Sequence, residues 1–191
     1  MKIFPTNIIK ELDQYTIQNE PINSADLVER AARVFVHEFC RRYSKQTQLI
    51  VFAGQGNNGA DALAIARLLL DEGYRLKTYL FNPTNHLSYD CELNKQRLLA
   101  MANIDFTEVV DDFIPPVLTS RDMVIDGLFG SGLNRPLTGG FAAVVRYINL
   151  SEATVVSIDI PSGLFGEDNR TNIPSAIIQA HTTLTFGFPK L

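Results

Sequence analysis

Cysteine is scarce in this sequence, and its two cysteines, Cys40 and Cys91, stand alone in the chain. A disulfide framework requires paired cysteines, and a zinc site requires Cys and His ligands at short, regular spacings. Neither pattern is present, so we expect two free or buried thiols and no zinc site.

The chain also lacks a basic run, and its formal net charge is −4 at pH 7. Binding to a nucleic-acid backbone needs concentrated positive charge, so nucleic acid is not expected as the main partner.

No apolar run reaches membrane-spanning length, and residues 1–14 lack the apolar centre and cleavage site of a signal peptide. These absences predict a cytoplasmic protein with no membrane partner. An anionic ligand is then expected to be captured locally, by backbone amides and a few side chains.

The composition is that of one ordinary globular domain, and all 191 residues are expected to belong to it. Residues 1–45 are predicted to be a helical extension packed on this domain.

Two helices are predicted within residues 5–43, separated by Pro21. Asn23 or Ser24 is expected to cap the second helix. That helix carries a wide apolar stripe: Leu27, Val28, Ala31, Ala32, Val34, Phe35 and Phe39. The stripe suits packing on a sheet, on a second subunit or on both, and core packing is the preferred interpretation.

The most informative stretch runs from residue 49 to residue 70. Leu49–Phe52 is a short apolar run, as expected of a buried parallel strand. Residues 54–59 read GQGNNG, which is a G-x-G-x-x-G pattern. An amphipathic helix follows, with one apolar face: Leu63, Ala66, Leu69 and Leu70. Strand, glycine turn and helix form the context of a dinucleotide-binding loop, because glycines allow close approach and the helix start attracts an anion.

Two details separate this loop from that of a classical NAD-dependent oxidoreductase. The next strand, Leu76–Phe81, is expected to end in an Asp or Glu that holds a ribose hydroxyl, but Asn82 stands there. The turn is also more polar than a plain phosphate cradle, because it contains Asn57, Asn58 and Asp61. Hydride transfer is therefore disfavoured, and the loop is expected to present side chains as well as backbone.

From residue 49 onward, predicted strands and helices alternate. Further strands are expected at residues 75–81, 106–109, 123–126, 154–160 and 182–186. Helices are expected at residues 88–101, with Leu93, Leu98 and Leu99 facing inward, and at residues 139–149, whereas 111–119 is a proline-interrupted segment. The alternation predicts an α/β fold: a Rossmann-like three-layer αβα sandwich with a mostly parallel sheet and two extra N-terminal helices.

Three polar, glycine-containing loops follow three of the predicted strand ends, at residues 53–61, 126–140 and 159–166. In such sheets ligands bind beyond the carboxyl ends of the strands, so the loops are expected to meet at one site. Asp126 and Asp159 each stand at a strand end, where a carboxylate either serves a ligand or only stabilises the turn. For a single loop the structural role is the commoner one. Three such loops at one sheet edge favour a functional site.

These motifs resemble a known family. GQGNNGAD at 54–61, DGLFGSGLNRP at 126–136 and SIDIPSGL at 157–164 are similar to the YjeF N-terminal domain of the NAD(P)H-hydrate epimerases. The resemblance extends to LVERAA at 27–32 and TLTFGFPK at 183–190, and so covers nearly the whole chain. It implies an isomerase that interconverts the R and S forms of NADHX and NADPHX, the damaged hydrates of NADH and NADPH. A dehydratase, fused or separate, then restores the reduced cofactor.

The resemblance also implies a set of binding residues. Contacts with the hydrated dinucleotide are expected from Asn57, Asn58, Gly59, Ala60, Asp61 and Asp159. Its phosphates are expected at Gly130, Ser131, Gly132, Leu133, Asn134, Arg135 and Pro136. A potassium ion, the cofactor of the family, is expected at Asn58, Asp126 and Ser162, because oxygen atoms suit a hard cation. A homodimer through the two N-terminal helices is also implied. Arg135 and Lys190 are candidate contacts for the extra phosphate of NADPHX.

Asp159 is the candidate catalytic residue. Inversion of the hydrated ring carbon proceeds by loss of hydroxide and re-addition of water, or by ring opening and closure. Both routes need a group that donates and accepts a proton. A potassium-bound Asp126 is less free to transfer protons, so it receives a ligand role. The alternative for Asp159 is hydrogen bonding to the substrate alone, with water transferring the proton.

The sequence departs from the family pattern where Ala60 and Ala62 replace glycines. If residue 60 needs a positive φ, alanine costs about 1 kcal/mol of strain, whereas alanine is favourable if the residue opens the helix.

A second interpretation of the chain is a non-catalytic nucleotide-binding or protein-interaction module, because a fold alone does not establish catalysis. The presence of Asp126, Asp159 and Ser162 favours the enzyme.

Overall fold

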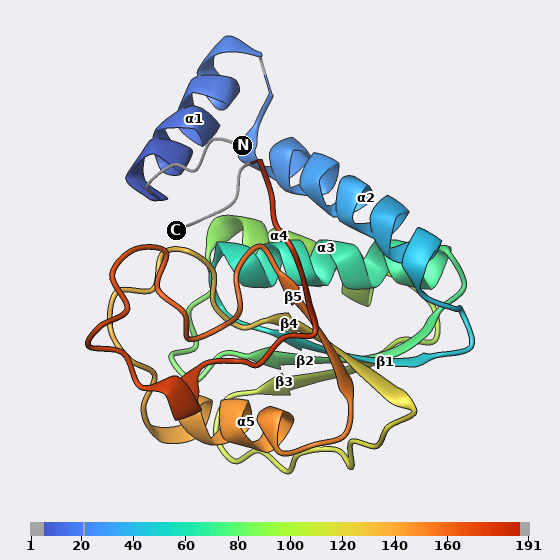
Figure 1. The fold of residues 1–191 in the computed structure, drawn as a ribbon. Helices are drawn as coiled ribbons and strands as arrows, with labels where there is room; N and C mark the ends of the chain where they lie inside the picture. Colours follow the sequence, from blue (N-terminus) through green and yellow to red (C-terminus); the bar gives the residue numbers. More distant parts are fainter. Residues whose placement is uncertain (1–5, 21, 188–191) are drawn as a thin grey trace.

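The structure is a computed structural model, and it describes residues 6–20 and 22–187. Its centre is a parallel sheet with the strand order β3-β2-β1-β4-β5-β6 (Figure 1). The strands are β1 (Gln48–Ala53), β2 (Arg75–Phe81), β3 (Asp105–Val109), β4 (Asp122–Gly127), β5 (Thr154–Ile158) and β6 (Thr182–Leu184). The order reverses between β1 and β4, as in doubly wound nucleotide-binding folds, which bind their ligands at this reversal.

Helices cover both faces of the sheet, which confirms the predicted three-layer α/β sandwich (Figure 1). They are α1 (Thr6–Asn19), α2 (Ser24–Arg42), α3 (Asn57–Asp71), α4 (Tyr89–Leu99), α5 (Gly139–Asn149) and the short 3₁₀ helix η1 (Pro174–Ala176). Helices α2, α3 and α4 pack on one another over one face, and α5 lies on the other face beside η1. Helix α1 projects beyond the layer formed by α2, α3 and α4 (Figure 1).

The central strand β1 is buried on both faces, and this divides the core into two parts. Leu49, Val51 and Ala53 pack in the cluster of α2, α3 and α4, whereas Ile50 and Phe52 pack in the cluster of α5. Alternate residues of a strand point to opposite faces, so a strand covered on both sides must be apolar throughout. The apolar run predicted to be the first strand is thus confirmed.

Helix α3 is buried on nearly all sides, because α2, α4 and the sheet surround it. Ala60 and Ala62 are both fully buried within this helix, and neither has a positive φ. Small side chains allow the neighbouring elements to approach closely, and alanine has the best helix propensity. Of the two outcomes considered for Ala60, the helical and favourable one is confirmed.

The cap and most of the apolar stripe of α2 agree with the sequence prediction. The side chain of Asn23 accepts a hydrogen bond from the backbone N–H of Asp26, with an O–N distance of 2.8 Å. Val34 is an exception, because its side chain is 64% exposed and Val36 is buried instead. Leu99, also predicted to face inward, is 41% exposed at the end of α4. In both cases the 100° turn per residue of a helix carries the side chain past the buried face.

Two strands end two residues earlier than the sequence predicts. Strand β5 stops before Asp159, because this residue adopts a φ of 65°, which an extended strand does not accommodate. Strand β6 ends at Leu184, and the backbone N–H of Phe186 donates instead to the carboxylate of Asp159 at 3.0 Å. The early ends therefore belong to a single local arrangement at the sheet edge.

Both cysteines are free thiols, as predicted, with Cys40 half-buried and Cys91 fully buried. Burial raises the pKa of the Cys91 thiol to about 12, so this group stays protonated at neutral pH.

Among the described residues, no group of three or more His, Cys, Asp or Glu side chains gathers as a metal site. None of the described helices is long and apolar enough to cross a membrane.

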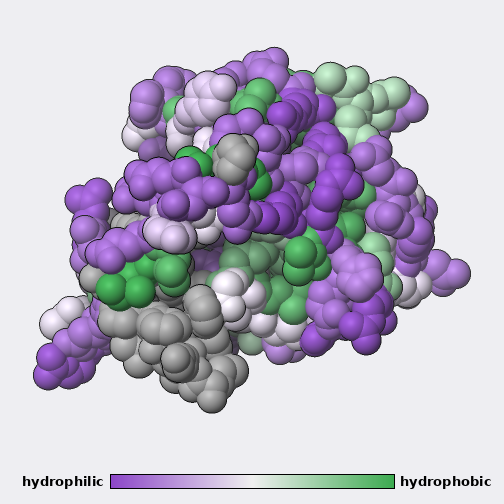
Figure 2. Space-filling view, turned by 90° about the horizontal axis from the view of Figure 1, so that it is seen from above, coloured by the Kyte–Doolittle hydropathy of each residue, from purple (hydrophilic) through white to green (hydrophobic). Residues whose placement is uncertain are grey.

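The outer surface near α1 and α2 is largely hydrophilic, and its apolar side chains form separate patches (Figure 2). Leu12 and Tyr15 of α1 and Val34 of α2 are the large apolar residues exposed on these helices in the described part of the chain. A homodimer that uses these helices stays a prediction.

The loops after β1 and β4 approach each other so closely that glycine is required. A Cβ atom on Gly59 would lie 1.7 Å from the carbonyl oxygen of Gly54, and one on Gly54 would lie 1.9 Å from that of Leu128. The backbone N–H of Gly54 also donates to the carbonyl of Gly127 at 3.0 Å. These contacts hold the loop between β1 and α3 against the end of β4 and the first residue after it.

We predict that Gly59→Ser destabilises the fold by about 2 kcal/mol, because the new side chain must displace the backbone of Gly54. Gly56→Ser is the matched control in the same loop. A Cβ atom at Gly56 meets nothing within 4 Å, and serine is a good N-cap residue for α3. Urea unfolding followed by circular dichroism measures both variants. Equal unfolding midpoints for the two would contradict the argument.

Candidate functional site

A cleft of about 820 Å³ opens at the carboxyl ends of β1, β4 and β5, where the strand order reverses. The loops that follow these strands meet there, as expected from parallel strands. Its walls come from these loops, from the end of β6 and from α1: Leu12, Thr16, Gln55, Gly56, Asn57, Asn58, Asp61, Leu128, Phe129, Gly130, Ser131, Gly132, Leu133, Asp159, Phe186 and Gly187.

Helix α1 contributes Leu12 and Thr16 to the cleft. The N-terminal extension therefore belongs to the site as well as to the outer layer. Sequence reasoning missed this contribution, because the periodicity of a helix indicates an apolar face but not the surface on which that face lies.

The start of α3 faces the cleft. The N-cap residue is Gly56, which has no side chain to cap the helix. Asn57 and Asn58 follow as the first helical residues. The first backbone N–H groups of a helix have no partner within it and carry the positive end of its dipole. This end suits an anionic group such as a phosphate. Asp61, one turn later, is partly buried in the same wall.

Asp126, near the end of β4, is completely buried. Its carboxylate accepts hydrogen bonds from Ser157 Oγ at 2.8 Å, from the backbone N–H of Ser162 at 2.9 Å and from Ser162 Oγ at 2.5 Å. The backbone N–H of Leu128 adds a longer contact of 3.4 Å. Strand register places Ser157 of β5 directly beside Asp126. The carboxylate thus ties the end of β4 to β5 and to the loop that follows β5.

The charge of Asp126 has no opposite charge beside it in the described part of the chain. None of the ion pairs formed by the described residues includes Asp126. Burial raises the pKa of this carboxyl above its ordinary value. The hydrogen bonds from Ser162 and Ser157 offset only part of that rise. A buried carboxylate is costly without a cation, so a cation beside Asp126 would offset the lost hydration.

The residues predicted to bind a cation come together around the backbone of Phe129. Asn58 Nδ2 donates to the carbonyl oxygen of Phe129 at 3.0 Å, and the backbone N–H of Phe129 donates to Ser162 Oγ at 2.9 Å. Ser162 Oγ lies 3.2 Å from the same carbonyl, but its single proton serves either this oxygen or Asp126. One carboxylate with amide, hydroxyl and carbonyl oxygens is a donor set that fits a hard cation of low charge.

Asp159 lies at the edge of the cleft, beyond the end of β5. Its carboxylate oxygen Oδ1 accepts a hydrogen bond from the backbone N–H of Phe186 at 3.0 Å and one from Thr185 Oγ1 at 3.3 Å. Its own backbone N–H donates to the carbonyl of Leu184 at 2.9 Å. Aspartate tolerates a positive φ better than most residues, and strained backbone of this kind is typical of functional sites. The segment after β6 therefore positions this carboxylate.

The phosphate-binding loop predicted at residues 130–136 divides into two parts. Residues 130–133 line the cleft. Asn134 and Arg135 are exposed and, together with the half-buried Pro136, lie outside its lining. Contact of the last three residues with a ligand stays a prediction.

Two of the other predicted contacts, Gly59 and Ala60, are buried in the first turn of α3 and do not line the cleft. Lys190 lies outside the described residues. Conversely, Ser157 and Phe129 take part in the site although neither was predicted to be a site residue. Both lie inside the recognised motifs. Their partners follow only from strand register and from the folding of the loop.

Comparison with known proteins places the chain in a family. A family model described as "YjeF-related protein N-terminus" matches residues 24–191. The NAD(P)H-hydrate epimerase of Limosilactobacillus fermentum is 33% identical over 179 residues, which are 93% of this chain and 82% of that protein. The bifunctional NAD(P)H-hydrate repair enzyme Nnr of Thermofilum pendens is 34% identical over 195 residues, which span 100% of this chain and 36% of that protein.

A solved structure has the same fold. The crystal structure of yeast ynu0, YNL200c, has a TM-score of 0.73 with 21% sequence identity and covers 100% of this chain and 82% of that one. The match of the family model extends from the start of α2 to residue 191 and contains all three loops of the cleft. The chain therefore belongs to the YjeF-related N-terminal family.

Proposed function

We propose that this protein is an NAD(P)H-hydrate epimerase, an isomerase that interconverts the R and S forms of NADHX and NADPHX. The observation that carries the proposal is the meeting of the Asp159 carboxylate and the start of α3 in one cleft, in a chain whose relatives bear this name. The cleft volume, about 820 Å³, is within the range of cofactor and small-molecule sites.

The pyrophosphate of the substrate is proposed to lie between the start of α3 and residues 130–133. No lysine or arginine of the described chain lines the cleft. Backbone N–H groups and the dipole of α3 therefore supply the attraction for the phosphate oxygens. This arrangement agrees with a chain whose net charge is −4 and which has no basic run.

Inversion of the hydrate needs proton transfer at its hydroxyl oxygen. In the dehydration route, the Asp159 carboxyl donates a proton as the C–O bond breaks, so that water leaves and a ring iminium remains. A water molecule then adds to the opposite face of the ring and returns a proton to the carboxylate. Ring opening and closure requires the same exchange of a proton at that oxygen. Asp159 is thus the proposed general acid and base.

Asp159→Asn is expected to lower the rate of epimerisation at least about 100-fold, because the amide cannot exchange the proton. Asparagine also tolerates a positive φ, so the fold is expected to remain. The measurement supplies the R hydrate of NADPH and follows the S form by chromatography, with the spontaneous rate subtracted.

The matched control for this experiment is Asp168→Asn. Asp168 is an exposed carboxylate paired with Arg170 outside the cleft, so its removal is expected to leave the rate unchanged. Normal substrate binding with an undiminished rate in Asp159→Asn would refute the acid–base role. A folded wild-type protein that binds the dinucleotide without accelerating epimerisation would instead be a non-catalytic binding module.

A potassium ion is proposed to bind at Asn58, Asp126 and Ser162. Support comes from the buried carboxylate of Asp126, which has no ion-pair partner among the described residues, and from the oxygen donors around it. A monovalent cation matches the charge of a single carboxylate. When bound, it would supply positive charge that holds the loops after β1, β4 and β5 in the geometry of the cleft.

Potassium chloride is expected to raise the melting temperature relative to choline chloride at equal ionic strength. At ten times the dissociation constant, the stabilisation is about 1.4 kcal/mol, or a few degrees for a chain of this size. Asp126→Asn is expected to abolish this increment, whereas Asp159→Asn keeps it. Differential scanning calorimetry measures the shift. An equal potassium increment in wild type and Asp126→Asn would exclude this ligand set.

The product is proposed to pass to a dehydratase that restores the reduced cofactor. The bifunctional NAD(P)H-hydrate repair enzyme of Thermofilum pendens supports a second activity beside this one, because this chain spans 36% of that protein. Whether the dehydratase is fused or separate does not alter the chemistry at the cleft. A homodimer through α1 and α2 and a cytoplasmic location remain part of the proposal.

A further inference from the structure

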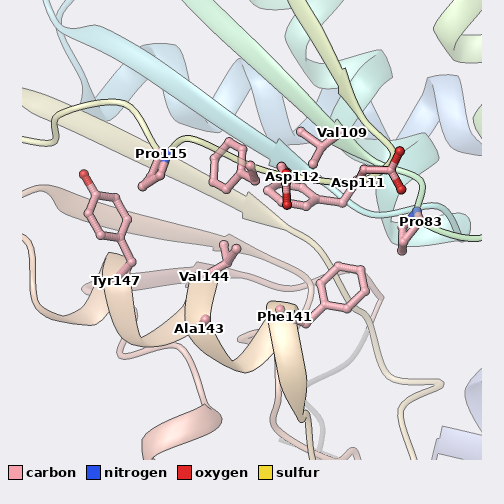
Figure 3. A pocket seen from close by; sticks show the side chains of 12 residues that line it. Pro83, Val109, Asp111, Asp112, Pro115, Phe141, Ala143, Val144 and Tyr147 are labelled. Atoms are coloured by element: carbon pink, nitrogen blue, oxygen red, sulfur yellow. The ribbon is translucent and has the colours of Figure 1, made fainter.

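A second pocket, of about 570 Å³, lies between α5 and the segment of residues 110–121 that joins β3 to β4 (Figure 3). Phe141, Val144 and Tyr147 line it from α5. Pro83, which follows β2, lies with Phe141 at one end of the pocket, and Tyr147 lies at the other end (Figure 3). The volume is within the range of small-molecule sites.

The pocket exists because the connection from β3 to β4 contains no helix. In a doubly wound sheet, a crossover helix normally covers this part of the sheet. Here the ring of Phe113 takes its place and packs edge-on against three rings of β1 and β2. The ring centroids are 6.3 Å away for Phe52, 5.2 Å for Tyr79 and 4.9 Å for Phe81. Phe52 and Tyr79 are buried beneath Phe113, whereas Phe81 and Phe113 line the pocket together with Phe141 and Tyr147 of α5.

The lining of the pocket favours a neutral flat ring over a phosphate. Its walls are mostly apolar, and no lysine or arginine of the described chain belongs to them. Asp111 and Asp112 are exposed and line the pocket opposite α5 (Figure 3). A carboxylate repels a phosphate but accepts a hydrogen bond from an amine, and aromatic faces stack with planar heterocycles. A purine with an exocyclic amine satisfies both requirements.

The pocket adjoins the cleft. The ring of Phe129, which lines the cleft, packs edge-on against that of Phe141, which lines the pocket, with centroids 4.7 Å apart. Thr84 Oγ1, in the turn after β2, donates to Gln55 Oε1 of the cleft at 2.9 Å. The pocket lies at the side of β2 and β3, whereas Asp159 follows β5. Asp159 and the β2 and β3 residues of the pocket thus lie on opposite sides of the reversal between β1 and β4, and the cleft spans this reversal.

We propose that this aromatic pocket binds the adenine ring of the hydrated dinucleotide, an inference that rests on the proposed function. The hydrated ring lies at Asp159, the pyrophosphate lies between the start of α3 and residues 130–133, and the adenosine continues toward β2. A dinucleotide carries its two rings at opposite ends of a pyrophosphate bridge, and the polar cleft and the apolar pocket offer the same order. Asp111 or Asp112 accepts the hydrogen bond of the exocyclic amine.

The test compares two substrates, the R hydrate of NADH and the R hydrate of reduced nicotinamide mononucleotide, which lacks the adenosine. Ala143 is exposed on α5 and lines the pocket, so Ala143→Trp fills the pocket from the surface. We expect KM for the hydrate of NADH to rise about tenfold or more, with kcat and the melting temperature unchanged. KM for the truncated substrate is expected to stay the same.

Arg146→Trp is the matched control, because Arg146 is exposed on the same helix but does not line the pocket. It is expected to change KM for neither substrate. Saturation-transfer NMR of adenosine monophosphate provides a second readout. Signals from its adenine protons are expected with wild type and Arg146→Trp and are expected to disappear with Ala143→Trp.

The outcomes separate the two proposals. If Ala143→Trp keeps the wild-type KM for the hydrate of NADH and still binds adenosine monophosphate, the adenine assignment is wrong and the epimerase proposal stands. An equal rise in KM for both substrates also overturns it, because the pocket would then act through the fold. A wild-type protein that epimerises neither substrate overturns the proposed function. Adenylate binding that Ala143→Trp abolishes would then still support the pocket.

Discussion

The completely buried carboxylate of Asp126 is the constraint on which the rest of the site depends. A carboxylate without water must receive hydrogen bonds from protein groups, and here Ser157 and Ser162 supply them. These bonds fix the loop after β5, and the same hydroxyl of Ser162 receives the backbone N–H of Phe129. The loops after β1, β4 and β5 are therefore parts of one network. A cation at this point would offset the negative charge of Asp126.

The sheet supports two different surfaces because its two faces are covered differently. On one face α2, α3 and α4 form a continuous layer, and the glycine contact between the loops after β1 and β4 brings the start of α3 to the cleft. On the other face α5 lies beside the short η1 and a connection without a helix, so aromatic rings of β1 and β2 are covered in part by Phe113. A polar site and an apolar site therefore lie next to each other at one edge. The proposed ligand has matching parts, because it carries a polar hydrated ring at one end of its pyrophosphate and a flat purine at the other.

The attraction for an anionic ligand comes from backbone geometry more than from charged side chains. The described lining of the cleft contains no lysine or arginine, yet it contains the uncapped start of α3. Backbone dipoles are fixed by the fold and need no ordering of long side chains when a ligand arrives. In the proposed reaction Asp159 remains near the hydrated ring, because its carboxylate is held by the segment after β6. Binding and proton transfer are thus proposed to occur in separate parts of one cleft.

The fold class, nearly all strands and helices, and three of the segments that line the cleft were predictable from the amino-acid sequence. These features follow from local patterns, such as the apolar run at Leu49–Phe52, the glycines of residues 54–59 and the Asn23 cap, which act over a few residues. Which groups touch depends on how distant segments of the chain pack together. The pairing of Ser157 with Asp126 depends on the register of two strands, and the place of α1 at the cleft depends on packing across the chain. The positive φ of Asp159 and the aromatic pocket under a connection without a helix are likewise consequences of long-range contacts. Local periodicity carries no information about such contacts, because the same helix or strand is compatible with many neighbours.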